Sequence, residues 1–161
     1  MSNSWFKFKQ FTVNHDKCAM KVGVDGVTLG AWADVSSAKK VLDVGCGSGL
    51  ISLMVAQRCN AQIIAIDIDS QSIIQAAENV DNSPWKDRIK IQHISLQEYA
   101  RVTSDRFDVI ISNPPYFINS LKNPSQSRTT ARHTDTLSHE DLLKCSRKLL
   151  HPDGKLCLIL P

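Results

Sequence analysis

Short and almost uninterrupted apolar runs recur along the chain from residue 40 onward. They cover residues 40–44, 62–67, 88–94, 106–112 and 155–160. Strands that are buried on both faces of a parallel sheet show continuous runs of this kind, whereas half-exposed strands alternate between apolar and polar residues. The pattern therefore predicts five strands of one parallel sheet.

Helical stretches separate these strands, and we expect them over residues 50–58, 70–80, 96–101 and 138–150. Ser70 can cap the second of them, and "SHED" at 138–141 has the form of a capping box that opens the fourth. "HPDG" after the fourth helix is expected to be a turn. Strands that alternate with helices are typical of a doubly wound α/β domain, which binds its ligands beyond the carboxyl ends of the strands.

The two ends of the chain differ from this regular middle. Residues 1–38 read as irregular, with scattered aromatics and lysines, although the glycines of "KVGVDGVTLGAWA" suggest turns and its apolar end suggests a short helix. The last apolar run stops at Pro161. A strand at a sheet edge offers unpaired backbone. We therefore expect that the sequence is a fragment truncated after the fifth strand, or that a missing segment or a partner chain covers this edge.

Composition excludes several classes of protein and leaves others open. The chain has 161 residues, a net charge of +3 and a pI near 8.6, which suits an acidic partner such as RNA without demanding one. No CxxC pair or Cys/His cluster has zinc spacing, so we expect no metal site. Reduced thiols, no signal peptide and no membrane-length apolar run indicate a cytoplasmic protein without a membrane partner.

The loop "DVGCGSG", residues 43–49, is the first stretch with candidate chemistry. Gly45, Gly47 and Gly49 let the backbone pass close to a ligand, and the helix that follows offers free N–H groups at its positive end. A dinucleotide site of the G-x-G-x-x-G type would need glycine where Leu50 stands. An ordinary tight strand-to-helix turn is the alternative.

Acidic residues accompany this loop. Asp67 ends the second strand, where a carboxylate can accept hydrogen bonds from both hydroxyls of a ribose, or can simply be a solvated strand end. Asp69 is expected to cap the next helix. Asp43 could face a ligand ammonium group or bind the N–H groups of the loop itself.

The glycine loop, the second strand and its acid together resemble the class I S-adenosylmethionine-dependent methyltransferases. The resemblance implies a Rossmann-like fold and S-adenosyl-L-methionine as cofactor, with the loop at its methionine part and Asp67 at its ribose. Many members carry an aspartate after the third strand that binds the adenine amino group. Here Ser95 stands in its place, and a serine hydroxyl is a weaker acceptor.

"SNPPYF", residues 112–117, is the second stretch with candidate chemistry. Pro114 and Pro115 have no N–H and a fixed φ, so the carbonyl of Pro114 and the side-chain oxygen of Asn113 can act as two acceptors for a planar –NH2 group. Tyr116 can stack on a flat ring. We predict a catalytic corner for methylation of an exocyclic amine, although a proline-terminated strand with incidental aromatics is the alternative. NPPY here resembles the methyltransferases of adenine N6, cytosine N4 and glutamine N5.

Three further stretches of the sequence point to one family among these methyltransferases. "FTVNHDKCAMKVGVDGVTLGAWA", "SPWKDRI" and "ARHT" resemble the bacterial tRNA1(Val) adenine-37 N6-methyltransferases. This implies methylation of an adenine in a tRNA anticodon loop, by a core over 39–161 whose cofactor site is covered by a segment over 1–38. The cofactor-binding residues implied are Lys21, Asp25, Asp43, Gly45, Gly47, Gly49, Asp67, Ile68, Ser95, Leu96 and Asn113. A salt-linked surface turn is the alternative for Lys21 and Asp25.

The polar stretch 117–137 is either a solvated connection or an RNA-contacting flap. In the second case Phe117, Lys122, Arg128 and Arg132 bind the tRNA, the cations through its phosphates. A glutamine N5-methyltransferase of a release factor also has NPPY, but the helical N-terminal domain usual there does not appear in this sequence. A DNA adenine methyltransferase normally adds a target-recognition region. A non-catalytic, cofactor-binding protein of an RNA complex is the remaining alternative.

Overall fold

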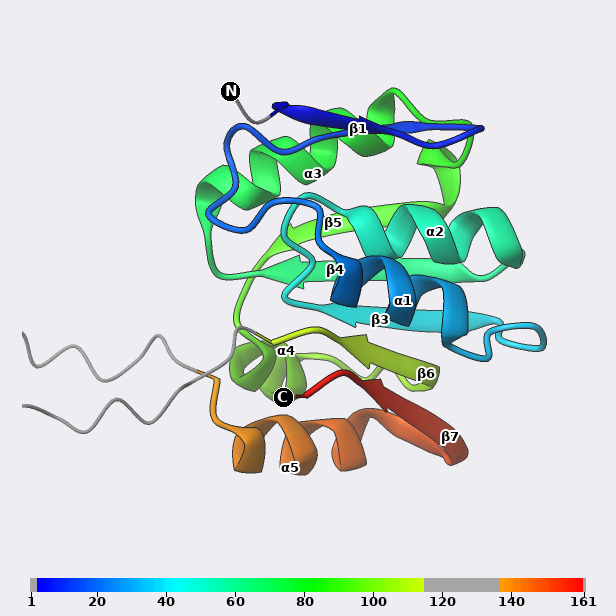
Figure 1. The fold of residues 1–161 in the computed structure, drawn as a ribbon. Helices are drawn as coiled ribbons and strands as arrows, with labels where there is room; N and C mark the ends of the chain where they lie inside the picture. Colours follow the sequence, from blue (N-terminus) through cyan, green and yellow to red (C-terminus); the bar gives the residue numbers. More distant parts are fainter. Residues whose placement is uncertain (1–2, 115–136, 161) are drawn as a thin grey trace, which may run out of the picture.

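A computed structural model describes residues 3–114 and 137–160 of the chain. Its centre is a five-stranded parallel sheet in the order β5-β4-β3-β6-β7 (Figure 1). The strands are β3 (Lys40–Val44), β4 (Gln62–Asp67), β5 (Ile89–His93), β6 (Phe107–Ser112) and β7 (Leu150–Leu158). The predicted doubly wound α/β fold is confirmed, and the strand order reverses between β3 and β6.

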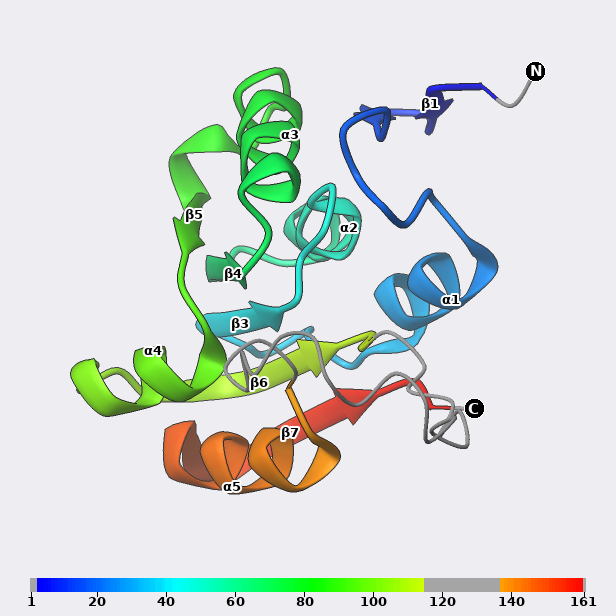
Figure 2. The same cartoon turned by 90° about the vertical axis from the view of Figure 1, so that its left-hand side faces the viewer.

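Helices cover both faces of the sheet, as Figure 2 shows. One face carries α1 (Val24–Trp32), α2 (Leu50–Arg58) and α3 (Ser70–Asp81), and the other carries α4 (Leu96–Val102) and α5 (His139–Leu149). A short 3-10 turn, η1 (Lys86–Arg88), leads into β5. The chain therefore crosses to opposite faces after β3 and after β6, which makes their carboxyl ends the switch point of the sheet.

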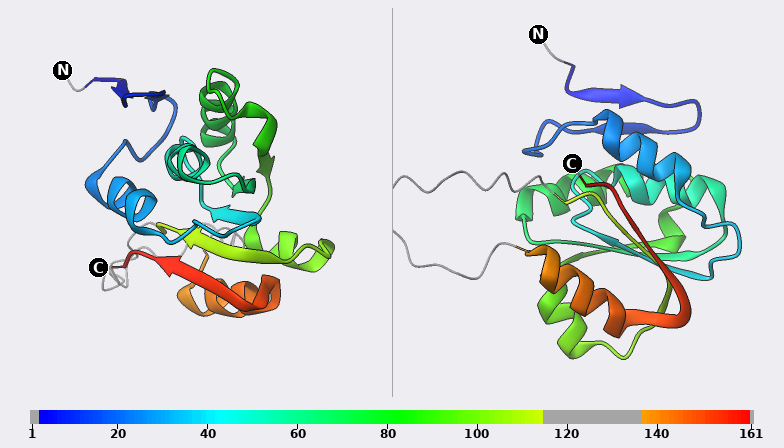
Figure 3. Two further views of the ribbon diagram at one scale, coloured as in Figure 1. Left: turned by 90° about the vertical axis from the view of Figure 1, so that its right-hand side faces the viewer. Right: turned by 60° about the horizontal axis from the view of Figure 1, so that its bottom comes forward.

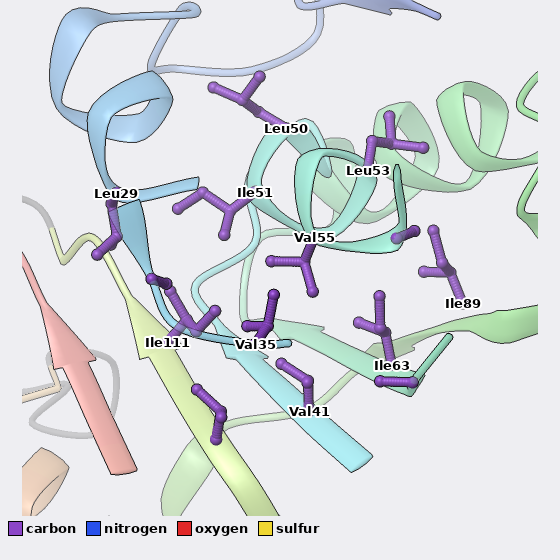
Figure 4. Close-up of a cluster of buried hydrophobic side chains, with 14 of the residues drawn as sticks. Leu29, Val35, Val41, Leu50, Ile51, Leu53, Val55, Ile63, Ile89 and Ile111 are labelled. Carbon is purple, nitrogen blue, oxygen red and sulfur yellow. The ribbon is translucent and has the colours of Figure 1, made fainter. Parts of the chain in front are cut away.

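Neighbouring residues of each central strand pack on opposite faces. Val41 and Ile111 belong to the cluster under α1 and α2, which Figure 4 shows, whereas Leu42 and Ile110 belong to the cluster under α4 and α5. All four are 0% exposed. This two-sided burial is the physical reason why the strands read as continuous apolar runs.

The N-terminal segment is more regular than the sequence predicts. Residues Trp5–Lys7 (β1) and Thr12–Asn14 (β2) form an antiparallel hairpin that lies outside the layer of α1, α2 and α3 (Figure 3). Strands of three residues are too short to show a period in the sequence. The rings of Phe8 and Phe11 stack with centroids 4.5 Å apart and close the hairpin, and Trp85 meets Phe11 edge-on at 5.5 Å.

Two glycines expected in turns lie inside α1 instead. A Cβ atom at Gly30 would come within 2.7 Å of the Met54 sulfur, and one at Gly26 within 3.0 Å of a Leu50 methyl group. These glycines let α1 approach α2 closely, so packing between the helices decides their conformation. The short helix predicted at the apolar end of this stretch is confirmed.

The predicted caps of two helices and the predicted turn at "HPDG" can be compared with the structure. Asp69 caps α3, as expected for it, since its carboxylate accepts a hydrogen bond from the Ser72 N–H at 2.8 Å; Ser70, the other candidate, is the first residue of the helix. Ser138 caps α5 as expected and accepts from the Asp141 N–H at 3.0 Å. "HPDG" is not a separate turn, because residues 151–154 belong to β7, where the pairing with β6 shifts register.

The cysteines, the possible metal ligands and the lengths of the helices in the structure can also be compared with what the sequence predicts. The five cysteines are free thiols, and burial raises the pKa of Cys18, Cys46 and Cys157, so these three stay neutral at physiological pH. Within residues 3–114 and 137–160, no group of three His, Cys, Asp or Glu side chains is arranged to hold a metal ion. The helices of the same residues are all too short or too polar to cross a membrane.

Candidate active site

A cavity of about 460 Å³ opens at the carboxyl ends of β3, β4, β5 and β6, on the left of the sheet in Figure 1. Its lining residues lie within five segments of the chain, 18–26, 44–51, 66–72, 94–97 and 112–114, together with Leu137. Gly49, predicted to bind the cofactor, does not line it and faces Ala76 instead. Parallel strands bring their carboxyl ends to one edge, so the loops that carry the predicted site residues meet there.

The glycine loop forms the floor of this cavity. Gly45, Gly47 and Gly49 have φ values of 71°, 53° and 79°, in the left-handed region that favours glycine. A Cβ atom at Gly45 or Gly47 would meet no protein atom within 4 Å. The backbone at these two positions therefore faces open space, with room for a ligand to approach closely.

Hydrogen bonds to β4 hold the loop in this shape. The carbonyl of Ile66 accepts from the N–H groups of Gly45 at 2.9 Å and of Cys46 at 3.1 Å. Asp67 Oδ2 accepts from the Gly47 N–H at 2.8 Å, and its Oδ1 accepts from the Asp69 N–H at 2.9 Å. Each carboxylate oxygen keeps a second lone pair, so Asp67 can orient the loop and still accept from a ligand in the cavity.

Asp43 lies beneath the loop and does not line the cavity. Its side chain is 1% exposed; Oδ2 accepts from the Ser52 hydroxyl at 2.6 Å, whereas Oδ1 has no hydrogen-bond partner among the described residues. Burial raises the pKa of Asp43 to about 6, against the lowering effect of the Ser52 hydrogen bond. The idea that Asp43 binds the N–H groups of the loop is wrong for Gly45, Cys46 and Gly47, because β4 supplies their acceptors.

The first turn of α4 forms another end of the cavity. Ser95 caps this helix, and its hydroxyl oxygen accepts from the Glu98 N–H at 3.2 Å. Leu96 is buried and lines the cavity beside it. Gln97 also lines the cavity, and its side-chain NH2 group donates to Asp141 Oδ2 at 3.4 Å. Gln97 is not among the predicted site residues, although its place shortly after the third predicted strand was a usable signal.

The predicted catalytic corner begins at the end of β6. The Ser112 hydroxyl donates to the Val44 carbonyl at 2.8 Å and ties this strand end to β3. Asn113 and Pro114 line the same cavity as the glycine loop, and the Asn113 side-chain nitrogen lies 3.9 Å from the Cβ position of Gly26 in α1. The other predicted residues of this region, Pro115, Tyr116, Phe117, Lys122, Arg128 and Arg132, lie outside the described residues.

The N-terminal segment supplies the wall opposite α4. Residues 18–26, Lys21 and Asp25 included, line the cavity. The buried His15 holds this segment, since its Nε2 donates to the Asn3 carbonyl at 2.9 Å and its Nδ1 accepts from the Val22 N–H at 3.3 Å. The carbonyl can only accept, which assigns the proton to Nε2.

Asn79 on α3 joins this segment to the glycine loop. Its side-chain NH2 group donates to the carbonyls of Asn14 and Ser48, both at 2.8 Å, and its oxygen accepts from the Asn14 N–H at 2.9 Å. Gln75, one turn earlier, accepts from the Lys17 N–H at 3.1 Å. Neither residue carries a sequence signal for this role, because both look like ordinary polar positions of a helix.

A second depression, more open and about 770 Å³ in volume, lies near the amino ends of β6 and β7. Arg106, Arg147, Lys148 and His151 are among its lining residues. None of the predicted site residues within 3–114 and 137–160 lines it. The smaller cavity at the switch point is therefore the candidate active site.

Comparisons with known proteins show the family to which the chain belongs. Residues 29–160 match the sequence model of the family "Methyltransferase small domain". The chain is 57% identical to the tRNA1(Val) (adenine(37)-N6)-methyltransferase of Phocaeicola vulgatus over 100% of the chain and 68% of that protein. The protein of the same name from Parabacteroides distasonis is also 57% identical, with the same coverage, and that of Erwinia tasmaniensis is 52% identical over 97% of the chain and 64% of its own length.

Solved structures share the fold at lower identity. A SAM-dependent methyltransferase from Agrobacterium tumefaciens superposes with a TM-score of 0.69 at 19% identity, over 99% of this chain and 53% of that one. TrmN from Thermus thermophilus superposes with a TM-score of 0.63 at 23% identity, over 84% of this chain and 37% of that one. A Geobacter sulfurreducens SAM-dependent methyltransferase, solved with S-adenosyl-L-homocysteine, superposes with a TM-score of 0.60 at 19% identity, over 89% of this chain and 49% of that one. By its family match and its 57% identity to curated relatives, the chain belongs to the family of bacterial tRNA1(Val) (adenine(37)-N6)-methyltransferases.

Proposed function

We propose that this chain transfers a methyl group from S-adenosyl-L-methionine to N6 of adenine 37 in tRNA1(Val), the reaction that the names of its relatives state for them. One observation carries the proposal from the structural side. The glycine loop and the Asn113–Pro114 corner line one cavity, so a cofactor on the loop and an amine at the corner would meet in it.

The residues of the cavity fit the cofactor. The open, left-handed backbone at Gly45 and Gly47 admits the methionine part, and the start of α2 adds free N–H groups. Asp67 keeps lone pairs for the ribose hydroxyls, beside Ile68. Asp43 lies beneath the glycine loop and does not line the cavity, so it would act on the cofactor through its negative charge and not by direct contact. S-adenosylmethionine, when bound, supplies an electrophilic methyl group on a sulfonium.

The corner at the end of β6 would position the target amine. The side-chain oxygen of Asn113 and the carbonyl of Pro114 accept hydrogen bonds from the two N–H bonds of the amine, which concentrates the nitrogen lone pair toward the methyl group. Catalysis would then consist of in-line positioning and electrostatic complementarity, without an obligatory strong base. Pro115 and Tyr116 would complete the corner by rigidity and stacking.

Other parts of the proposal rest on the resemblance and on the lining of the cavity. The N-terminal segment, 1–38, covers the cofactor through residues 18–26, which include Lys21 and Asp25. Phe117, Lys122, Arg128 and Arg132 contact the tRNA, whose target base must leave its stack to enter the cavity. The protein works in the cytoplasm, where its tRNA substrate is.

A transfer assay with tritiated cofactor tests this function. We expect label in unmodified tRNA1(Val) and its loss in a transcript with guanine at position 37. Asn113→Ala should lower kcat about 100-fold or more while most of the affinity for S-adenosylhomocysteine remains, because the main loss is an acceptor for the target amine. The exposed Asn60→Ala is the matched control and should keep full activity. Label in a release factor or in DNA, with none in tRNA, would contradict the assignment.

A further inference from the structure

The proposed function does not say which residue at the α4 end of the cavity would recognise the adenine of the cofactor. If S-adenosylmethionine binds as proposed, its adenine carries an amino group that needs a hydrogen-bond acceptor. Asp67 and Asp69 are the carboxylates that line the cavity from the β4 side. Asp67 holds Gly47 and is assigned to the ribose, and Asp69 caps α3, so neither is placed for the amino group.

Ser95 is the weaker candidate. Its hydroxyl oxygen already accepts from the Glu98 N–H as the cap of α4. The oxygen keeps a second lone pair, but a hydroxyl that already caps a helix is a poorer acceptor for an amino group than a side-chain amide oxygen.

Gln97, two residues further on, has the required acceptor. A carboxylate such as Asp141 can only accept, so the side-chain amide of Gln97 must present its NH2 group to Asp141 Oδ2. This orientation leaves the oxygen Oε1 of a cavity-lining side chain without a donor from the described residues. The backbone of Asp141 lies in the first turn of α5, where its N–H donates to the Ser138 hydroxyl, so the carboxylate that anchors the amide projects from a capped helix start.

We propose that Gln97 selects the adenine of the cofactor by accepting a hydrogen bond from its 6-amino group through Oε1. Asp141 positions Gln97, and the apolar side chains of Ile68 and Leu96 line the same cavity and suit the faces of a flat ring. The inference rests on the proposed function, because it assumes this cofactor.

Isothermal titration with two ligands tests the inference. One ligand is S-adenosylhomocysteine and the other is its 6-deamino analogue, which differs only by the missing amino group. The wild-type protein should prefer the first about tenfold, since the analogue leaves Oε1 of the half-buried Gln97 unpaired. Gln97→Ala should bind both within a factor of two of each other. Gln62→Ala removes an exposed glutamine at the opposite, amino edge of the sheet and should keep the tenfold preference.

A swap and an isosteric variant complete the design. Gln97→Glu combined with Asp141→Asn exchanges donor and acceptor between the two residues, keeps an oxygen toward the ligand and should restore the preference. Gln97→Met keeps the volume of the side chain if Gln97→Ala does not fold, and it should abolish the preference.

The outcomes separate this inference from the proposed function. A wild-type preference that persists in Gln97→Ala or Gln97→Met would overturn the inference and leave the function standing. An equal loss of affinity for both ligands in these variants would also overturn the inference, because it would show that Gln97 has a merely structural role. A wild-type protein that binds neither ligand would overturn the proposed function and this inference together.

Discussion

Asn79 shows how a single buried side chain can organise this site. It satisfies both backbone groups of Asn14 and the carbonyl of Ser48, and so connects the hairpin, α3 and the glycine loop. Its side chain is 1% exposed, and water therefore cannot replace the lost partners easily.

We expect Asn79→Ala to destabilise the protein by about 3 kcal/mol, because three hydrogen bonds are lost and their backbone partners stay buried. Urea unfolding measures the effect. Asn60→Ala, at an exposed position after α2, should change the free energy of unfolding by less than about 0.5 kcal/mol. Equal effects of the two substitutions would show that Asn79 does not hold the site together.

Asp43 makes stability depend on pH in a defined direction. Its pKa is raised from 3.8 to about 6, so the folded state keeps the proton over a range where the unfolded state has lost it. The contribution to stability is complete below pH 4 and is lost as the pH rises through 6. A shift of this size corresponds to about 3 kcal/mol.

Asp43→Asn removes this titration. Urea unfolding of both proteins at pH 4, 5, 6 and 7 should show that the wild type loses up to about 3 kcal/mol relative to the variant over this range. The difference should be steepest between pH 4 and 6 and constant above 7. A difference that does not vary with pH would mean that Asp43 titrates normally in the folded chain.

At the scale of elements, the stretch "SPWKDRI" has a structural reason. Trp85 packs on Phe11 of the hairpin. The Arg88 guanidinium donates to the carbonyls of Ala56, Cys59 and Ala61 at 2.8–3.0 Å, and so closes the last turn of α2 and the chain that leaves it. A motif that resembles a family can therefore be structural rather than catalytic.

Arg88→Ala should destabilise the protein by about 2–3 kcal/mol, because carbonyl groups at the end of α2 lose a charged donor. Thermal or urea unfolding measures the loss. Lys86→Ala, at an exposed position of η1, should have an effect below about 0.5 kcal/mol. If both variants unfold alike, the guanidinium contacts contribute nothing to the stability of α2.

The glycine loop should separate ligand binding from stability. In Gly47→Ala the new Cβ atom would meet no protein atom within 4 Å, so the cost to folding is the left-handed conformation alone, about 1–2 kcal/mol. The same atom would occupy space in the cavity. Affinity for S-adenosylhomocysteine, measured by calorimetry, should fall at least tenfold. Unchanged affinity in a folded variant would place the cofactor away from the loop.

At the scale of the whole molecule, the cavity joins parts of the chain that lie far apart in sequence. Its wall at 18–26 is attached to α3 through Asn14 and Asn79, which are 65 residues apart. A ligand in the cavity would contact this wall as well as the sheet. Ligand binding should therefore order the N-terminal segment more than a folded core that is already rigid.

Hydrogen exchange tests whether the N-terminal segment covers the cofactor. With saturating S-adenosylhomocysteine, the amides of residues 18–26 should exchange at least tenfold more slowly than in the free protein. The hairpin turn at 8–11 lies outside the cavity wall and is the internal control, which should not change. Equal protection in both stretches would indicate general stabilisation, and none at 18–26 would contradict a covering role.

Part of the site region could be predicted because it depends on local chemistry. The left-handed glycines and the capping residues act within a few positions of the chain. The roles inside the loop region were harder to predict. Asp67, and not Asp43, holds the Gly47 N–H, and Ser95 uses its hydroxyl oxygen on its own helix. Such choices depend on distances of a few ångströms that no spacing in the sequence specifies.

The sequence by itself determined the five strands, the helices between them and the edge at which the glycine loop, Asp67 and Asn113 meet, because hydrophobic burial and parallel pairing leave little other choice. The tertiary structure alone decided that a hairpin lies over α3 and that Gln97 is anchored 44 residues away on Asp141. These contacts join segments that are brought together by the packing of side chains. Such packing produces no periodic pattern in the sequence from which it could be predicted.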